Sequence, residues 1–352
     1  MHSPLFNIFA PAVVAFAVGI LITPIVTHYL YKNCAWKKQA GKTALNGKVA
    51  EVFNQLKGAD ETKTPRMGGI VIWGSILITT VLTHIIGLLH PHSAFADFDF
   101  LSRSQTFIPL AALLLGACIG FLNDFYDIAH GGKGLSLKIR LVLITSLSGT
   151  LAWWFYAKLG VDSINLPFAG FLNLGVLIIP FFIFLTLSLY ASGVIDGIDG
   201  LSGGVFSAVF AAYSGIALVQ NQLDVAAFCA TVTGAILAFL WFNIPPARFW
   251  MTETGSMALT LCLATVVFTT DTLGDGHGIA LLPIVGFPLV ITVLSNVLQI
   301  GYRKATGKKL FRIAPLHHHF EAIGWPSYKV TMRYWIISIV CALVGVALAT
   351  VI

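Results

Sequence analysis

The stretch FNIFAPAVVAFAVGILITPIVTHYL, residues 6–30, decides the fold class of this chain. It contains no Asp, Glu, Lys or Arg, and it exceeds the roughly 20 apolar residues that cross the hydrocarbon core of a bilayer. No basic leader or small-residue cleavage site accompanies it, so the pattern favours a retained membrane span over a signal peptide.

Further stretches of the same kind follow along the whole chain. The 352 residues are 57% hydrophobic and only 10% charged, whereas soluble domains average about 25% charged residues. No separate soluble domain is visible, so residues 1–352 are predicted to form one all-α, polytopic membrane domain. The ten predicted spans are roughly 6–30, 68–89, 106–126, 138–157, 174–194, 203–221, 225–243, 255–271, 279–301 and 333–352.

The basic residues lie almost entirely on one side of this ten-span arrangement. Of the 21 lysines and arginines, only Arg103 and Lys158 fall on the other side. Cytoplasmic loops carry the excess of Lys and Arg. The bias therefore predicts that residues 31–66 and 302–332 face the cytoplasm and that both termini lie outside it, in the periplasm. It also accounts for the net charge of +6 without a nucleic-acid partner.

Three acidic clusters lie at the predicted cytoplasmic ends of spans three, five and eight. Acids at a membrane boundary raise the free energy unless they are solvated or bind a ligand. Carboxylates beside lysines suit Mg²⁺, which in turn holds phosphate oxygens; the alternative is that each acid is only a solvated helix cap. The clusters are NDFYD at 123–127, DGIDG at 196–200 and WMTETGS at 250–256.

The spacing within the second cluster predicts its geometry. Asp196 and Asp199 are three residues apart, which places both carboxylates on one helical face, and the glycines beside them allow close approach by a ligand. One acid from each cluster, namely Asp124, Asp199 and Glu253, is predicted to lie around a single Mg²⁺ and a diphosphate. Asp124 and Glu253 are the predicted metal ligands.

A histidine motif, PLHHHFE at 315–321, lies in the last predicted cytoplasmic loop. Neutral histidine binds metal or moves protons, and cationic histidine binds phosphate. Zinc is disfavoured because no cysteine is near and the acids are oxygen ligands suited to Mg²⁺. His317 and His318 are therefore predicted to contact phosphate or the attacking group, while a loop that is merely rich in histidine is the alternative.

Together these features predict phosphoryl-type transfer at the membrane–cytoplasm boundary, a reaction in which positioning and neutralising phosphate charge supply most of the catalysis. A nucleotide-linked donor reaches such a site from water, and a phospholipid acceptor reaches it from the bilayer. A secondary transporter is the main alternative outside enzymes. Transporters place their charges near the midplane, usually in repeated halves, and no internal repeat is visible here.

Several motifs resemble, in order along essentially the whole chain, the phospho-N-acetylmuramoyl-pentapeptide transferase family. The resemblance implies transfer of phospho-N-acetylmuramoyl-pentapeptide from its UDP-linked donor to undecaprenyl phosphate, giving UMP and the first lipid intermediate of peptidoglycan synthesis. It also implies Mg²⁺, a homodimer in the bacterial inner membrane, and a cytoplasm-facing cleft near a broken ninth span. The motifs are TPRMGG at 64–69, KGLS at 133–136, DGIDGL at 196–201, WFN at 241–243, Gly255-Ser256, PLHHHFE at 315–321 and Gly324-Trp325-Pro326.

The resemblance also implies roles for individual residues. Pro283, Gly286 and Pro288 are compatible with the break in span nine. Catalytic roles are expected for Asp124, Asp199, His317 and His318. Substrate contacts are expected from Thr64, Lys133, Asp196, Asn243, Trp250 and His319.

The chain departs from the family pattern in its acidic clusters. It has Asn123 where the family has an aspartate, Asp127 where the family has a lysine, Gly193 where it has an asparagine, and Glu253 where it has a metal-binding aspartate. Asn123 cannot act as a base, so Asp127 is expected to take over part of that catalytic task. Asp127 also makes the segment similar to the D-D-x-x-D pattern of the wider polyprenyl-phosphate sugar-phosphate transferase superfamily. The alternatives are therefore a related N-acetylhexosamine-1-phosphate transferase and a catalytically silenced relative.

Overall fold

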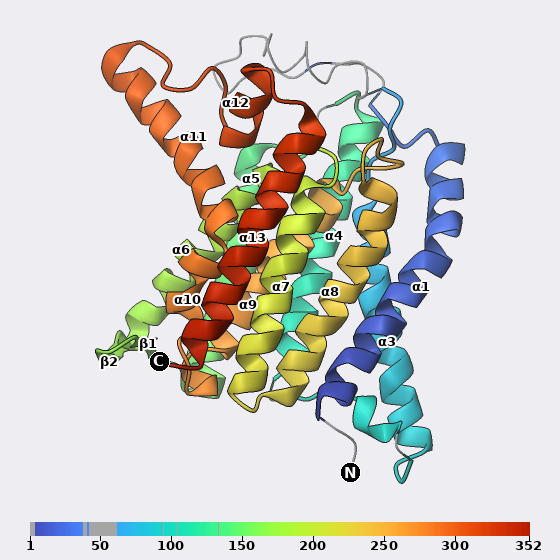
Figure 1. The fold of residues 1–352 in the computed structure, drawn as a ribbon, viewed down its shortest axis with the longest axis vertical. Helices are drawn as coiled ribbons and strands as arrows, with labels where there is room; N and C mark the ends of the chain where they lie inside the picture. Colours follow the sequence, from blue (N-terminus) through green and yellow to red (C-terminus); the bar gives the residue numbers. More distant parts are fainter. Residues whose placement is uncertain (1–3, 38–40, 42–61, 94, 104, 133) are drawn as a thin grey trace.

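The computed structural model describes residues 4–37, 41, 62–93, 95–103, 105–132 and 134–352, and this part of the chain is almost wholly helical (Figure 1). A small antiparallel hairpin is formed by β1 (Ser163–Leu166) and β2 (Gly170–Asn173). The helices are α1 (Pro4–Lys32), α3 (Gly69–Leu89), α4 (Phe107–Ala129), α5 (Leu137–Leu159), α6 (Ile178–Ser192), α7 (Leu201–Val219), α8 (Leu223–Asn243), α9 (Thr252–Thr269), α10 (Gly278–Val285), α11 (Phe287–Thr306), α12 (Leu316–Ala322) and α13 (Ser327–Ala349).

The predicted all-α membrane architecture is confirmed. Within the described residues, nine helical segments are long and apolar enough to cross a membrane, and the pair α10–α11 makes a tenth span that is bent by 73°. The bend falls at Gly286, which ends α10 and begins α11. Pro288 follows in the first turn of α11, where a missing backbone N–H costs no helical hydrogen bond. The predicted break in span nine is therefore present, and α11 leaves the bundle at an angle (Figure 1).

Helix α9 is the central helix of the bundle. Its apolar segment is 94% buried inside the protein, compared with 22% for α1 and 17% for α13. Exclusion of water cannot hold helices together inside a bilayer, so small residues that permit close packing are needed. Gly120 of α4 provides such a contact, since a Cβ there would lie 2.0 Å from the backbone oxygen of Glu253. This approach brings the acidic end of α4 to the start of α9.

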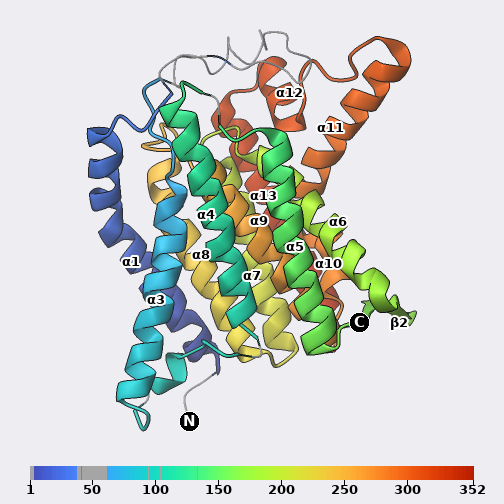
Figure 2. The same cartoon turned by 180° about the vertical axis from the view of Figure 1, so that it is seen from behind.

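Different elements of the chain lie at the two ends of the bundle. The start of α1, the end of α13 and the β hairpin lie at one end, whereas α12 and the far end of α11 lie at the other (Figures 1 and 2). The acidic end of α4 and the start of α9 lie toward the α12 end. The positive-inside pattern predicts that the α12 end faces the cytoplasm, and the orientation stays a prediction.

Candidate active site

A group of buried and partly buried acids and arginines surrounds the start of α9, and we call it the carboxylate centre. Asp124 at its middle is fully buried. Its Oδ2 accepts hydrogen bonds from Thr252 Oγ1 at 2.6 Å, from the backbone N–H of Thr254 at 2.8 Å and from Thr254 Oγ1 at 2.6 Å. These donors, at a helix N-terminus that favours negative charge, hold the carboxylate in one place. The members of the centre are Asp124, Asp127, Asp196, Glu253, Arg66 and Arg140.

Thr252 connects this centre to two other segments of the chain. Its backbone N–H donates to Asp196 Oδ2 at 2.8 Å, and its hydroxyl accepts from the backbone N–H of Met67 at 3.0 Å. Its φ of 55° lies in the left-handed region, which a β-branched residue adopts only when its surroundings enforce it. Strain at this position is consistent with a geometry built for function.

Asp196 and Asp199 do not share a helical face, so that prediction is wrong. Residues 196–200 form turns between a short 3₁₀ segment and α7, because Gly200 adopts a left-handed φ of 74° before the helix begins. Asp196 joins the carboxylate centre, where burial raises the pKa of its carboxyl while hydrogen bonds from Ser202 and Thr252 act to lower it. Asp199 instead accepts from Trp250 Nε1 at 3.0 Å and from the backbone N–H of Ala247 at 3.1 Å.

Two arginines neutralise part of the negative charge, and the sequence reasoning missed both. Arg140 donates to Glu253 Oε1 at 2.6 Å. Arg66 lies 3.6 Å from Asp124 Oδ1 and 3.3 Å from Asp127 Oδ2. In the sequence, both arginines belong to basic segments that are predicted to face the cytoplasm, and Arg66 also lies in the TPRMGG motif. Their partners are far away in sequence, so only the packing of α3, α4, α5 and α9 reveals the pairs.

The donor set of the carboxylate centre fits one Mg²⁺. Mg²⁺ usually takes one or two carboxylates and completes its shell with water and substrate phosphates. Among the described residues, Asp124 Oδ1 has distant contacts to Asn123 Nδ2 at 3.4 Å and to Arg66, and Glu253 Oε2 has one to Ser256 Oγ at 3.5 Å. These two oxygens are left for a cation. The described residues contain no group of three or more His, Cys, Asp or Glu that could hold a metal by itself.

A second group, the histidine centre, consists of His317, His318, Glu321 and Ser327. His318 Nδ1 lies 2.7 Å from Glu321 Oε2, and Ser327 Oγ donates to Glu321 Oε1 at 2.5 Å. A Cβ on Gly197 would lie 2.5 Å from His318 Nε2 and 3.0 Å from His317 Nε2. Both imidazoles therefore face the turn at 196–200, and Gly197 is required there by their close approach.

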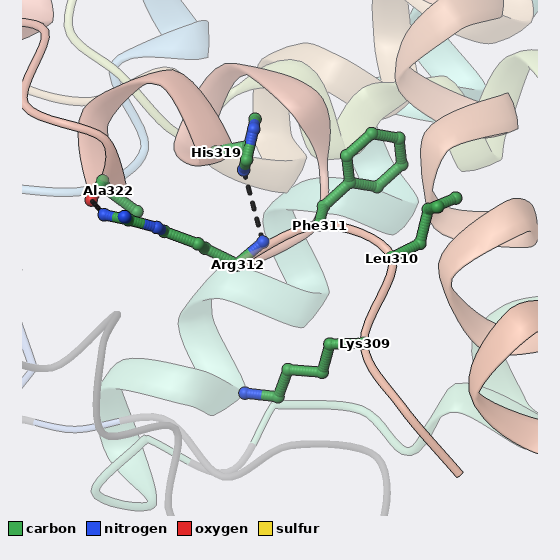
Figure 3. A pocket seen from close by; sticks show the side chains of 6 residues that line it. All are labelled: Lys309, Leu310, Phe311, Arg312, His319 and Ala322. Carbon is green, nitrogen blue, oxygen red and sulfur yellow. Dashed lines mark hydrogen bonds between the residues drawn. The ribbon is translucent and has the colours of Figure 1, made fainter. Parts of the chain in front are cut away.

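His319 has different surroundings from the other two histidines. Its Nδ1 accepts a hydrogen bond from the backbone N–H of Arg312 at 3.2 Å, and its ring meets Phe311 edge-on. Arg312 Nη1 also donates to the Ala322 carbonyl at 2.9 Å, which ties this loop to α12. Together with Lys309 and Leu310, these side chains line an open pocket of about 570 Å³ (Figure 3).

Two further predicted residues hold the 196–200 turn in position. Asn243 is buried at the end of α8; its Oδ1 accepts from the backbone N–H of Gly200 at 2.9 Å, and its Nδ2 donates to the Phe249 carbonyl at 2.8 Å. Trp250 holds the Asp199 carboxylate. Asn243 and Trp250 thus position the segment around Asp199.

Asn123 and Asp127 hold the loop that follows α4. Asn123 Oδ1 accepts from the backbone N–H of Leu135 at 3.1 Å, and Asp127 Oδ1 accepts from that of Gly134 at 3.1 Å. Thr64 is half-buried just before the segment that carries Arg66. Lys133 lies outside the described residues.

Fold and site together define an integral membrane protein with a polar, charged centre at one end of its helices. A family model described as glycosyl transferase family 4 matches residues 106–271, which include most of the carboxylate centre. The chain is 36% identical over 290 residues to the phospho-N-acetylmuramoyl-pentapeptide-transferase of Geobacillus sp. (strain WCH70), covering 81% of this chain and 84% of the relative.

Other relatives carry the same name. The protein of Chloroflexus aurantiacus is 32% identical over 305 residues, covering 82% of this chain and 77% of the relative. That of Corynebacterium efficiens is 32% identical over 373 aligned positions, covering 95% and 94%. The chain belongs to the phospho-N-acetylmuramoyl-pentapeptide-transferase family, and it is therefore a membrane-embedded transferase.

Proposed function

We propose that the protein transfers phospho-N-acetylmuramoyl-pentapeptide from its UDP-linked donor to undecaprenyl phosphate. The products are UMP and the first lipid intermediate of peptidoglycan synthesis. The names of the relatives support this substrate pair. One structural observation carries the proposal: the neighbours Asp196 and Gly197 join the carboxylate centre to the histidine centre at one end of the bundle.

The reaction exchanges one phosphoanhydride bond for another. An oxygen of the lipid phosphate attacks the sugar-bearing β-phosphorus, a new P–O bond forms, and the bond to the oxygen of the departing UMP breaks. A phosphate monoester already loses its second proton near pH 6, so the attacking group needs little help from a base. The protein's task is mainly to position the phosphates and to balance their charge.

The carboxylate centre is proposed to bind the donor diphosphate together with a divalent cation, on which proteins of this family typically depend. Asp124 and Glu253 would hold Mg²⁺, which supplies neutralisation of phosphate charge when bound. Asp127 is proposed to take part in the same task, beside Arg66. Asp199, held by Trp250, lies on the other side of the turn and is proposed to contact the donor there.

The histidine centre is proposed to act on the phosphates from the opposite side of the turn. Glu321 engages Nδ1 of His318, so Nε2 is the atom that faces Gly197. In the cationic form Nε2–H donates a hydrogen bond to a phosphate oxygen, and in the neutral form Nε2 accepts a proton. His317 stands beside it, with ring centroids 4.4 Å apart.

The polyprenyl chain of the acceptor needs an apolar surface, and one such surface reaches Ser192, four residues before Asp196. A pocket of about 320 Å³ lies between α6 and the bent pair α10–α11, lined almost entirely by apolar side chains. Phe181, Leu282 and Leu289 are among these side chains. We propose that this region receives part of the polyprenyl chain, and that the active site faces the cytoplasm of the bacterial inner membrane in a homodimer.

The test is UMP release by purified full-length protein in lipid nanodiscs. UDP-N-acetylmuramoyl-pentapeptide and UDP-N-acetylglucosamine are compared, each with and without undecaprenyl phosphate and Mg²⁺. We expect release only with the first donor, the lipid and the metal together. Release with UDP-N-acetylglucosamine would identify the related hexosamine-phosphate transferase. Donor binding without any release would identify a catalytically silenced relative.

A further inference from the structure

Backbone hydrogen bonds hold the segment around Arg66 next to the carboxylate centre. Its N–H donates to the Ala35 carbonyl at 2.7 Å, and the preceding Pro65 carbonyl accepts from the backbone N–H of Trp250 at 2.8 Å. Met67, the following residue, donates to Thr252 Oγ1 and has a left-handed φ of 69°. Contacts on both sides of Arg66 thus fix where its side chain begins.

The guanidinium of Arg66 is mostly buried, but its contacts to the neighbouring acids are long. It is 14% exposed, and its contacts to Asp124 and Asp127 are 3.6 and 3.3 Å long. Asp127 Oδ2 accepts no hydrogen bond within the described residues, and Arg66 Nε is a buried donor without a partner there. A buried charged group that lacks a hydrogen bond costs free energy. The N–H donors of Arg66 therefore have the capacity to bind an anionic ligand.

Asp124 accepts its hydrogen bonds mainly from donors other than Arg66. Its Oδ2 already accepts three hydrogen bonds from Thr252 and Thr254. Arg140 differs in one donor, since its Nη1 donates to Glu253 Oε1 at 2.6 Å, although its Nε also lacks a partner within the described residues. Within the described residues, Arg66 thus makes no hydrogen bond to an acid of the carboxylate centre, whereas Arg140 makes one.

We propose that Arg66 binds the diphosphate of the nucleotide donor and supplies the positive charge that the family pattern places at position 127. This inference rests on the proposed function. A guanidinium is always charged, and its fork of N–H donors matches two phosphate oxygens. Position 127 has an aspartate where the family has a lysine, and Arg66 lies 3.3 Å from this aspartate. On this proposal, Arg66 supplies the charge that the lysine supplies in the family.

The experiment compares the binding of UDP and of uridine to the purified full-length protein with Mg²⁺ present. Arg66→Gln should weaken UDP binding about ten- to a hundredfold, the loss of one or two charge-assisted hydrogen bonds. It should leave uridine binding unchanged, because uridine has no phosphate. Arg66→Lys keeps the charge without the fork and should fall between Arg66→Gln and the wild type. Arg303→Gln, on an exposed arginine of α11, is the matched control.

A relocation variant tests the second half of the proposal. Arg66→Gln/Asp127→Lys places a cation where the family has its lysine, and it should recover most of the UDP affinity that Arg66→Gln loses. A melting temperature measured for each variant separates binding from folding. Equal loss of UDP and uridine binding, or unchanged UDP binding in Arg66→Gln, would overturn the assignment. Failure of the double variant to recover affinity would overturn the relocation of charge.

The two proposals fail in different ways. If the wild type binds UDP no better than uridine, the proposed function is wrong. If the wild type favours UDP and Arg66→Gln favours it equally, only the role of Arg66 is wrong.

Discussion

The carboxylate centre and the histidine centre lie on two sides of the same turn, but they are held in different ways. Asp124 is fixed by three donors at the start of α9, and the close packing of α4 on α9 brings it there. His318 stands on the seven-residue helix α12 and is oriented by Glu321. Close packing of α4 on α9, together with donors from α9, thus fixes Asp124, whereas a carboxylate of its own short helix orients His318.

The difference suggests how each centre works. A carboxylate that already accepts three hydrogen bonds is held in a fixed geometry, which suits the binding of charge. An imidazole with one nitrogen on a carboxylate can hold or release a proton at the other. We therefore expect turnover to fall when a substitution removes a charge from the carboxylate centre. In the histidine centre, we expect it to fall when a substitution changes the orientation of an imidazole.

Asp124→Asn should have the largest effect, because it removes the central charge of the carboxylate centre. An amide presents a donor or a weaker acceptor to Thr252 and Thr254, so we expect a loss of turnover of about 10³-fold. UMP release and thermal unfolding are measured together. Asp97→Asn, on an exposed acid at the opposite end of the bundle, is the control and should be neutral. Near-normal turnover that EDTA does not inhibit would remove Asp124 from the site.

Glu321→Gln should break the histidine centre while the carboxylate centre stays intact. The amide still reaches His318 and Ser327 but no longer stabilises an imidazolium, so we expect kcat to fall about 100-fold. The KM for the donor should change by less than about threefold, since the carboxylate centre is proposed to supply most of the binding of the donor diphosphate. Glu321→Asp should recover part of the rate. A rise in KM with unchanged kcat would contradict this assignment.

Gly197→Ala tests whether the two centres act through one turn. The new Cβ would lie 2.5 Å from His318 Nε2 and 3.0 Å from His317 Nε2, so the imidazoles must move. Displacement of positioned groups by about 1 Å lowers rates by an order of magnitude or more, and we expect about tenfold. Gly301→Ala is the control, because a Cβ there meets open space on α11 and should stabilise the helix by up to about 1 kcal/mol. A normal rate in Gly197→Ala would show that the histidines are not confined by the turn.

Most of the fold was predictable because the hydrocarbon core imposes one requirement on every span. Length and apolar composition predicted ten spans, and the family resemblance implied the break in the ninth, with which Pro283, Gly286 and Pro288 are compatible. The short hairpin at Ser163–Leu166 and Gly170–Asn173 was not predicted, since four-residue strands leave little periodic signal. The central place of α9 was not predictable either, because hydropathy does not distinguish lipid from protein as a neighbour.

The candidate site was predictable as a set of residues but not as a geometry. Motif spacing selected Asp196 and Asp199, yet it assumed a helix where glycine allows a turn, and the two carboxylates point to different partners. Arg66 lies in the TPRMGG motif and Arg140 in a basic loop, but neither the motif nor the charge of the loop indicates an acidic partner. Their roles depend on contacts between distant segments, which a single sequence does not report.

Asn123→Asp should have the smallest effect and gives the finest test of the carboxylate centre. Asn123 Oδ1 accepts from the backbone N–H of Leu135, and an aspartate oxygen accepts that bond equally well, so the loop should stay in place. Among the described residues, the bond lost is the long contact of 3.4 Å from Nδ2 to Asp124. The new charge lies close to Arg66 and to the proposed Mg²⁺, which offset its repulsion from Asp124 and Asp127.

We therefore expect Asn123→Asp to turn over at the wild-type rate or up to about threefold faster, a change of less than about 1 kcal/mol in the activation barrier. Asp127→Ala should be severely impaired in the same assay, because Asp127 faces Arg66 and ties Gly134 to α4. If Asp127→Ala turns over normally, compensation by Asp127 is wrong. If the wild type is silent and only Asn123→Asp releases UMP, the natural protein binds its donor without catalysing transfer, and the carboxylate centre is a binding site alone.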